Sequence, residues 1–166
     1  GTAAVTLAGL ITALRVKKEK LSEQRYLFLG AGSSGLGTAD MLVSAMKLEG
    51  LNEEQACERI TLMDADGLLE ISRTDLIPEQ KRFARNAAPT KDLLATIRHV
   101  KPTVLIGVST CGGAFNQAII REMAALNERP IIFSLSLPET NAECTAEQAY
   151  TWSEGRALFA GGIQFP

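Results

Sequence analysis

A glycine-rich stretch at residues 30–35 has the spacing G-x-G-x-x-G and directly follows a short apolar run at residues 25–29. An apolar helical pattern begins at once after it. In such a strand–turn–helix unit, Gly30 makes the sharp bend, Gly32 lets the backbone approach a diphosphate, and Gly35 lets the helix pack close to the strand. The helix N-terminus adds free N–H groups and a partial positive charge. The stretch therefore predicts a dinucleotide pyrophosphate site.

An acidic residue lies where a dinucleotide site needs a hydrogen-bond acceptor for a ribose. Asp64 ends the next apolar run, residues 60–63, and its carboxylate could accept two hydrogen bonds from a ribose. It lies nearly thirty residues after Gly35, more than the usual distance of about 20 residues, because a long and a short helix intervene. The alternative is a turn aspartate before Asp66-Gly67.

Two later loops are the other candidates for contacts with the cofactor. Val108 ends a third apolar run at residues 103–108, Ser109 follows it, and the glycines of residues 112–113 permit close approach. The fourth run, residues 130–135, leads into Leu135-Ser136-Leu137-Pro138, which we expect near the nicotinamide end.

The elements that position these loops alternate along the chain. Strands are expected at the four runs above and at residues 157–160. Helical patterns cover residues 2–17, 33–49, 90–100, 116–127 and 145–153. Thr90 is expected to cap the third of these helices, and residues 68–90 show at best a short helix near Pro78. Strands that are apolar throughout predict an α/β fold: a doubly wound, Rossmann-like parallel sheet with helices on both faces.

Composition narrows the classes of function. The 166 residues suit one domain (residues 1–166), and a net charge of −2 gives no basic field for nucleic acid or a membrane surface. No apolar run approaches the ~20 residues of a membrane span, and residues 1–5 do not resemble a signal peptide. The three cysteines are far apart, which favours free thiols in a reducing compartment. No metal spacing or catalytic triad occurs, and His99 is interpreted as a cation at a helix C-terminus.

Several segments together resemble one family, the malic enzymes, and specifically their NAD-binding domain. The resemblance covers essentially the whole chain. It is carried by Gly1-Thr2-Ala3-Ala4-Val5, the glycine turn with Leu36-Gly37, Asp64 with Gly67-Leu68, Ile106-Gly107-Val108 with Gly112-Gly113-Ala114-Phe115, residues 123–133, Ala142-Glu143-Cys144-Thr145-Ala146-Glu147 and Gly155-Arg156-Ala157-Leu158-Phe159-Ala160.

The resemblance implies oxidative decarboxylation of malate to pyruvate, with hydride transfer to NAD or NADP and a divalent Mg or Mn ion in a full-length, homo-oligomeric enzyme. It implies that the catalytic tyrosine and lysine and the acidic metal ligands lie upstream of residues 1–5. We therefore expect this chain to be part of a larger enzyme, with no catalytic or metal-binding residues of its own and no turnover alone. The implied cofactor contacts are Leu29, Gly30, Ala31, Gly32, Ser33, Ser34, Gly35, Asp64, Gln80, Val108, Ser109, Leu135, Ser136 and Leu137.

The resemblance also bears on cofactor choice. Gln80 aligns with a position at which NADP-preferring members carry lysine, and a neutral amide offers no charge to a 2′-phosphate. Asp64 would repel that phosphate. The sequence therefore predicts NAD over NADP.

Two departures from the family pattern lie at the catalytic end. Leu137 replaces the usual asparagine and cannot form its hydrogen bonds, and residues 161–166 replace a more usual Ser-Gly-Ser-Pro-Phe. Two alternatives therefore stay open: a malolactic-type relative that decarboxylates malate to lactate and retains its NAD, and a non-catalytic module for dinucleotide binding or assembly.

Overall fold

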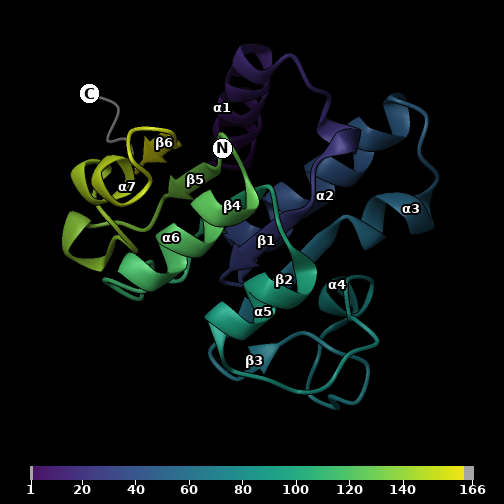
Figure 1. Cartoon of the computed structure of the whole chain (residues 1–166). Helices are drawn as coiled ribbons and strands as arrows, with labels where there is room; N and C mark the ends of the chain where they lie inside the picture. Colours follow the sequence, from purple (N-terminus) through teal and green to yellow (C-terminus); the bar gives the residue numbers. More distant parts are fainter. Residues whose placement is uncertain (1, 163–166) are drawn as a thin grey trace.

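The apolar runs form the strands of one central sheet in the computed structural model, which describes residues 2–162. The strands are β1 (Tyr26–Leu29), β2 (Ile60–Asp64), β3 (Gly67–Leu68), β4 (Val104–Gly107), β5 (Ile131–Ser134) and β6 (Leu158–Gly161). Their order is β3-β2-β1-β4-β5-β6, and every pair is parallel except β2 and β3. Figure 1 shows β1 and β4 side by side near the middle of the molecule.

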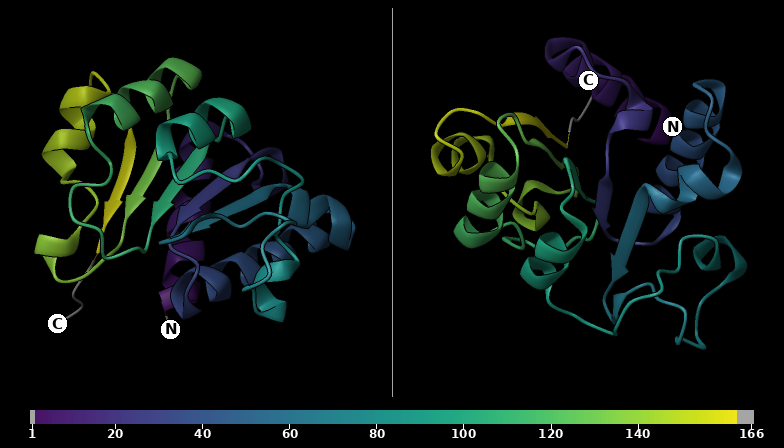
Figure 2. Two further views of the ribbon diagram at one scale, coloured as in Figure 1. Left: turned by 90° about the horizontal axis from the view of Figure 1, so that it is seen from below. Right: turned by 45° about the vertical axis from the view of Figure 1, so that its right-hand side comes forward.

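Helices cover both faces of this sheet (Figure 2). On one face, Tyr26 and Phe28 pack with α1 (Thr2–Lys17) and α2 (Ser33–Leu48). The intervening residue, Leu27, faces a second core. That core is completed by α5 (Leu93–Val100), α6 (Gln117–Leu126) and α7 (Ala146–Trp152). The predicted α/β fold with helices on both faces is confirmed: β1, β2, β4 and β5 are buried from either side, and the edge strand β6 is half-buried.

Side-chain caps mark the starts of four helices, with one correction to the sequence prediction. Asn52 caps α3 (Glu53–Glu58), Asn116 caps α6, and Thr145 caps α7. The prediction that Thr90 caps α5 was wrong. Asp92 is the cap, since its Oδ1 accepts from Ala95 N at 3.1 Å, while Thr90 Oγ1 accepts from Asp92 N.

Residues 67–90, where the sequence predicted at best one short helix, form an irregular segment beyond β2 at the edge of the sheet. This segment is called the excursion below. It contains the two-residue strand β3, which was not predicted, and α4 (Pro78–Lys81), the short helix that was. Backbone bonds from Ile71 N to Arg85 O and from Arg85 N to Leu69 O close the excursion. The 3₁₀ turns η1 (Leu21–Glu23) and η2 (Glu139–Asn141) complete the elements.

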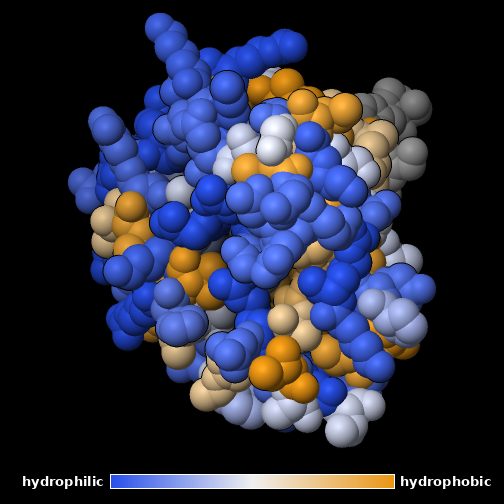
Figure 3. All heavy atoms as spheres, turned by 90° about the vertical axis from the view of Figure 1, so that its right-hand side faces the viewer, coloured by the Kyte–Doolittle hydropathy of each residue, from blue (hydrophilic) through white to orange (hydrophobic). Residues whose placement is uncertain are grey.

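Polar residues dominate the face that carries α3 and α4, where Figure 3 shows only small, separate hydrophobic groups. Within residues 2–162, no helix has the length and apolar character to cross a bilayer. The last residues of the C-terminal departure from the family pattern, 163–166, lie outside the described part of the chain.

The hydroxyl of Tyr26 gives a test of the first core. Tyr26 is fully buried and donates to Leu21 O at 2.8 Å. Tyr26→Phe should lower the free energy of unfolding by about 1 kcal/mol at neutral pH, because one buried hydrogen bond is lost. Urea denaturation of both chains measures this difference.

The same substitution should change how stability depends on alkaline pH. Burial, and then the charge of Glu49, raise the pKa of Tyr26 well above its ordinary value. Above about pH 10 the unfolded chain loses this proton and the folded chain keeps it, so wild-type stability falls by up to about 1.4 kcal/mol per pH unit. Tyr26→Phe should lack this component, whereas Tyr150→Phe, at a side chain 47% exposed, should keep the wild-type slope. Equal slopes for all three chains would contradict the assignment.

Candidate dinucleotide-binding site

The glycine turn begins where β1 ends, and its backbone approaches that of β4 closely. Gly30 has φ +120°, and a Cβ there would lie 2.5 Å from Val108 O. A Cβ at Gly35 would lie 2.5 Å from Gly30 O. Both positions therefore require glycine, the first for its backbone conformation and its neighbour, the second for close packing of α2 on the turn.

Gly32 differs from these two glycines because nothing fills the space beside it. Its φ is −85°, and a Cβ there would have no neighbouring atom within 4 Å. Gly32 is the N-cap of the 16-residue helix α2, and Ser33 and Ser34 in the first turn are exposed. The open surface thus lies at a helix N-terminus, the arrangement that binds a diphosphate.

Asp64 is paired with an arginine that the sequence analysis missed. Arg73 Nη1 and Nη2 donate to Asp64 Oδ1 and Oδ2, each at 2.8 Å, and Arg73 also binds Asp75 at 2.7 Å. Hydrogen bonds to Asp75 and then to Asp64 raise the pKa of Arg73. Asp64 Oδ1 also accepts from Asp66 N at 3.0 Å, so the turn bond of the alternative interpretation is present. Three of the about four lone-pair sites of the Asp64 carboxylate are thus taken, which leaves one for a ribose hydroxyl rather than the two that the sequence suggested.

Gln80 reaches the glycine turn from the irregular excursion. Its Nε2 donates to Ala31 O at 3.1 Å, and its Oε1 accepts from Ile77 N at the start of α4. The amide is partly buried and directly beside the turn. The structure therefore brings the glycine turn, Asp64 and Gln80 to the same end of β1 and β2.

The two predicted loops after β4 and β5 also come together. Leu29, Val108 and Leu135 are partly buried, each just at or beyond the carboxyl end of a strand. Thr110 N donates to Ser136 Oγ at 2.8 Å and joins the two loops. Leu137 is 42% exposed, beyond the end of β5.

A fully buried carboxylate, Glu143, lies beneath these loops, and sequence reasoning did not identify it as a site residue. Its Oε2 accepts from Ser109 N at 2.9 Å, Ser109 Oγ at 2.6 Å and Ser136 Oγ at 2.5 Å, and its Oε1 accepts from Ser134 Oγ at 3.2 Å. A Cβ at Gly107 would overlap this carboxylate. The glycine that ends β4 was the one signal in the sequence for such a close approach.

Two of the three cysteines, Cys57 and Cys144, and the histidine contribute no reactive group to this site, whereas Cys111 is an exposed free thiol in the loop after β4. Burial, and then the charge of Glu143, raise the pKa of Cys144 to about 12, so its thiol stays neutral. Burial likewise raises the pKa of Cys57 to about 11. His99 is exposed in the last turn of α5, as predicted. Among residues 2–162, no group of three or more His, Cys, Asp and Glu side chains could hold a metal ion.

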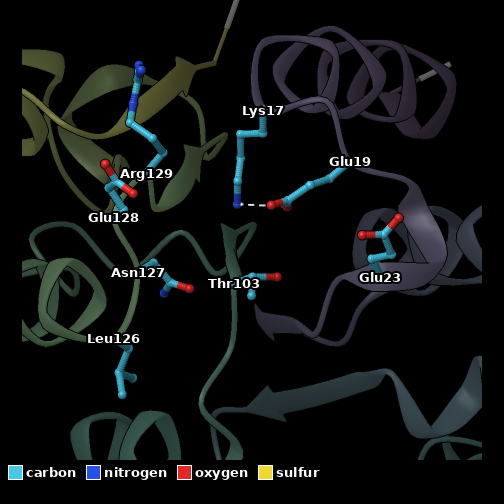
Figure 4. Close-up of a pocket in the computed structure, with 8 residues that line it drawn as sticks. All are labelled: Lys17, Glu19, Glu23, Thr103, Leu126, Asn127, Glu128 and Arg129. Carbon is cyan, nitrogen blue, oxygen red and sulfur yellow. Dashed lines mark ion pairs between the residues drawn. The ribbon is translucent and has the colours of Figure 1, made fainter.

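A separate hollow of about 410 Å³ lies at the amino ends of the strands, at the opposite end of the sheet from the candidate site. Thr103 lines it just before β4 begins, and Lys17, at the end of α1, forms an ion pair with Glu19 at 3.2 Å inside it (Figure 4). Because dinucleotides bind at the carboxyl ends of parallel strands, this hollow is not part of the candidate site.

Comparisons with known proteins agree with this geometry. The family model "Malic enzyme, NAD binding domain" matches residues 1–166. The chain is 51% identical over 166 residues to the mitochondrial NAD-dependent malic enzyme of Ascaris suum, covering 100% of this chain and 26% of that protein. It is 50% identical over 165 residues to the NADP-dependent malic enzyme of Columba livia, covering 99% of this chain and 30% of the relative.

A solved structure shows the same likeness. The crystal structure of Entamoeba histolytica malic enzyme superposes with a TM-score of 0.74 at 30% identity, over 98% of this chain and 32% of that one. The chain thus spans about a third or less of the length of these relatives. The match over all its residues shows that the chain belongs to the malic enzyme family and corresponds to its NAD-binding domain.

Proposed function

We propose that this chain binds NAD as the cofactor domain of an enzyme that oxidises malate and decarboxylates it to pyruvate. The observation that carries the proposal is the open backbone at Gly32, at the N-terminus of α2 and between glycines that admit no side chain. Bound NAD would supply the hydride acceptor. The chain's own residues would bind its diphosphate on α2 and orient its two halves on either side of β1.

The charges near Asp64 support NAD over NADP. Arg73 could attract a 2′-phosphate, but it is engaged by two carboxylates, Asp64 and Asp75. One guanidinium against two carboxylates leaves this cluster net negative, which disfavours the extra phosphate. Gln80 adds no positive charge beside the turn.

The substrate, the metal and assembly into a homo-oligomer belong to the proposal for a larger parent protein. The malic enzymes matched are more than three times as long as this chain, and we propose that the divalent ion and the acid–base pair come from the part that this chain does not span. No step of the reaction is therefore assigned to a residue here. We expect the 166-residue chain to bind NAD without turnover, and malate-dependent NADH formation by it would contradict this expectation.

A second candidate, a dinucleotide-binding module without malate chemistry, is favoured by Leu137. This exposed apolar side chain stands beyond β5, where the family carries an amide, and it cannot hold a ribose or substrate hydroxyl by a hydrogen bond. In the full-length protein, turnover separates the possibilities. Pyruvate and NADH indicate a malic enzyme, lactate a malolactic-type relative, and no product a binding module.

The first test places the diphosphate. Gly32→Ala should fold with a stability loss below about 1 kcal/mol, because its φ suits any residue and its Cβ meets no atom. The new methyl group would occupy the space that the diphosphate needs. We therefore expect NAD affinity to fall at least about tenfold by titration calorimetry.

Gly37→Ala is the matched control within α2. Its Cβ would make only an ordinary contact, 3.7 Å from the Cβ of Ala3. This variant should keep wild-type NAD affinity. If Gly32→Ala also binds NAD like the wild type, the diphosphate does not lie at this turn.

The second test concerns cofactor choice. Calorimetry of the unmodified chain should give tighter binding of NAD than of NADP, and equal or tighter NADP binding would refute the preference. Gln80→Lys should shift the ratio of the two affinities toward NADP by about tenfold or more, because a cation beside the turn gains a charge-assisted hydrogen bond to the 2′-phosphate. Gln117→Lys adds the same charge on the opposite face of the sheet and should leave the ratio unchanged.

A further inference from the structure

The buried carboxylate of Glu143 has an unusual set of partners. It is 0% exposed, and no Lys, Arg or His within residues 2–162 forms an ion pair with it. Its partners are instead the three serine hydroxyls and one backbone N–H described above. A buried charge is tolerated when hydrogen bonds replace its hydration. Ser109 and Ser136 lie in the two loops at the candidate site, and Ser134 ends β5.

The hydrogen bonds have a fixed direction. Ser109 Oγ accepts from Cys111 N at 3.0 Å, and Ser136 Oγ accepts from Thr110 N at 2.8 Å. A serine hydroxyl has one proton and two lone pairs. Each hydroxyl already accepts from a backbone N–H and directs its one proton to Glu143. One lone pair on each oxygen is not used by these bonds, and neither hydroxyl has a proton to offer.

The backbone around Glu143 holds the same loops. Phe115 N donates to Glu143 O at 2.9 Å, and Gly113 N donates to Ala142 O at 3.0 Å. The loop after β4 is therefore fixed at both its beginning and its end to the segment around residues 142–143. A shift of Glu143 would move the Ser109 loop and the Ser136 loop together.

We propose that Glu143 is a positioning residue for the nicotinamide half of the dinucleotide, which it serves by fixing Ser109 and Ser136 as hydrogen-bond acceptors. The inference rests on the proposed cofactor binding. Asp64 and Arg73 lie on the β2 side of the glycine turn, where the adenosine ribose is expected, so the other half extends over β4 and β5. A ribose hydroxyl or a carboxamide N–H₂ is a donor that such acceptors recognise.

The test separates the two halves of the ligand. Titration calorimetry compares NAD with ADP, which carries the diphosphate and the adenosine but lacks the nicotinamide ribose and ring. Glu143→Gln removes the charge and introduces an amide donor, which allows a serine hydroxyl to turn its proton toward the ligand. We expect NAD affinity to fall about tenfold or more and ADP affinity to change less than about twofold. A purely structural role would weaken both ligands alike.

Glu70→Gln is the matched control. Glu70 is also a buried glutamate and accepts from Ser72 N at 2.8 Å and from Ser72 Oγ at 2.7 Å, but it lies in the excursion beyond β3. It should show no selective loss of NAD. Ser136→Ala keeps Glu143 and its other three hydrogen bonds, and should repeat the selective loss of NAD affinity even if Glu143→Gln does not fold.

Each outcome supports or overturns a distinct claim. Loss of NAD affinity with retained ADP affinity in Glu143→Gln or Ser136→Ala supports the positioning role. Three results overturn it: equal losses of affinity for NAD and ADP, folded variants that bind NAD as tightly as the unmodified chain does, or an unmodified chain that binds NAD no more tightly than ADP. A wild-type chain that binds neither ligand overturns the proposed cofactor binding itself.

Discussion

Close contact between the backbone at the end of β1 and the backbone at the end of β4 is the constraint on which the site depends. Gly30 N donates to Met63 O at 2.7 Å, and Val108 N donates to Leu29 O at 2.8 Å, so the turn is tied to strands on both sides. Neither Gly30 nor Gly35 has room for a side chain. The helix α2 therefore starts at one fixed place, with Gly32 at its open end.

Local patterns predicted most of this arrangement. Short apolar runs gave the five parallel strands within one or two residues, because strands buried on both faces need apolar side chains throughout. The glycine spacing predicted the turn, since the conformation depends on the residues themselves. The strand β3 has only two residues and no periodicity to detect. Thr90 and Asp92 are both good caps, and only the backbone path decides between them.

Two residues that hold the candidate site in place, Arg73 and Glu143, were missed by sequence reasoning. Arg73 lies in the unreadable excursion, and its pairing with Asp64 depends on how that segment folds back on β2. Glu143 is a single glutamate in a loop, 34 residues from Ser109 and seven from Ser136. The contact with Ser109 joins elements distant in the chain, and the nearer contacts depend on how irregular loops fold back, so no spacing reveals them. Gly107 indicates a close approach but not which side chain fills the space.

The carboxylates of Asp64 and Glu143 have different kinds of partner. In the proposed binding mode, Asp64 bears on the choice between NAD and NADP, and Glu143 bears on the nicotinamide half that both share. Asp64 is partly exposed and balanced by a guanidinium, so a nearby side chain can reset the local charge. Glu143 is buried, and its carboxylate accepts hydrogen bonds from uncharged serine hydroxyls, so few other side chains could replace these partners. NAD and NADP differ only at the adenosine ribose, which the Asp64 side would bind, and share the nicotinamide half. Relatives with either cofactor in their names are about equally similar to this chain. With the proposed binding mode, cofactor preference would change through a few side chains near Asp64, while the Glu143 network would serve the half that both cofactors have in common.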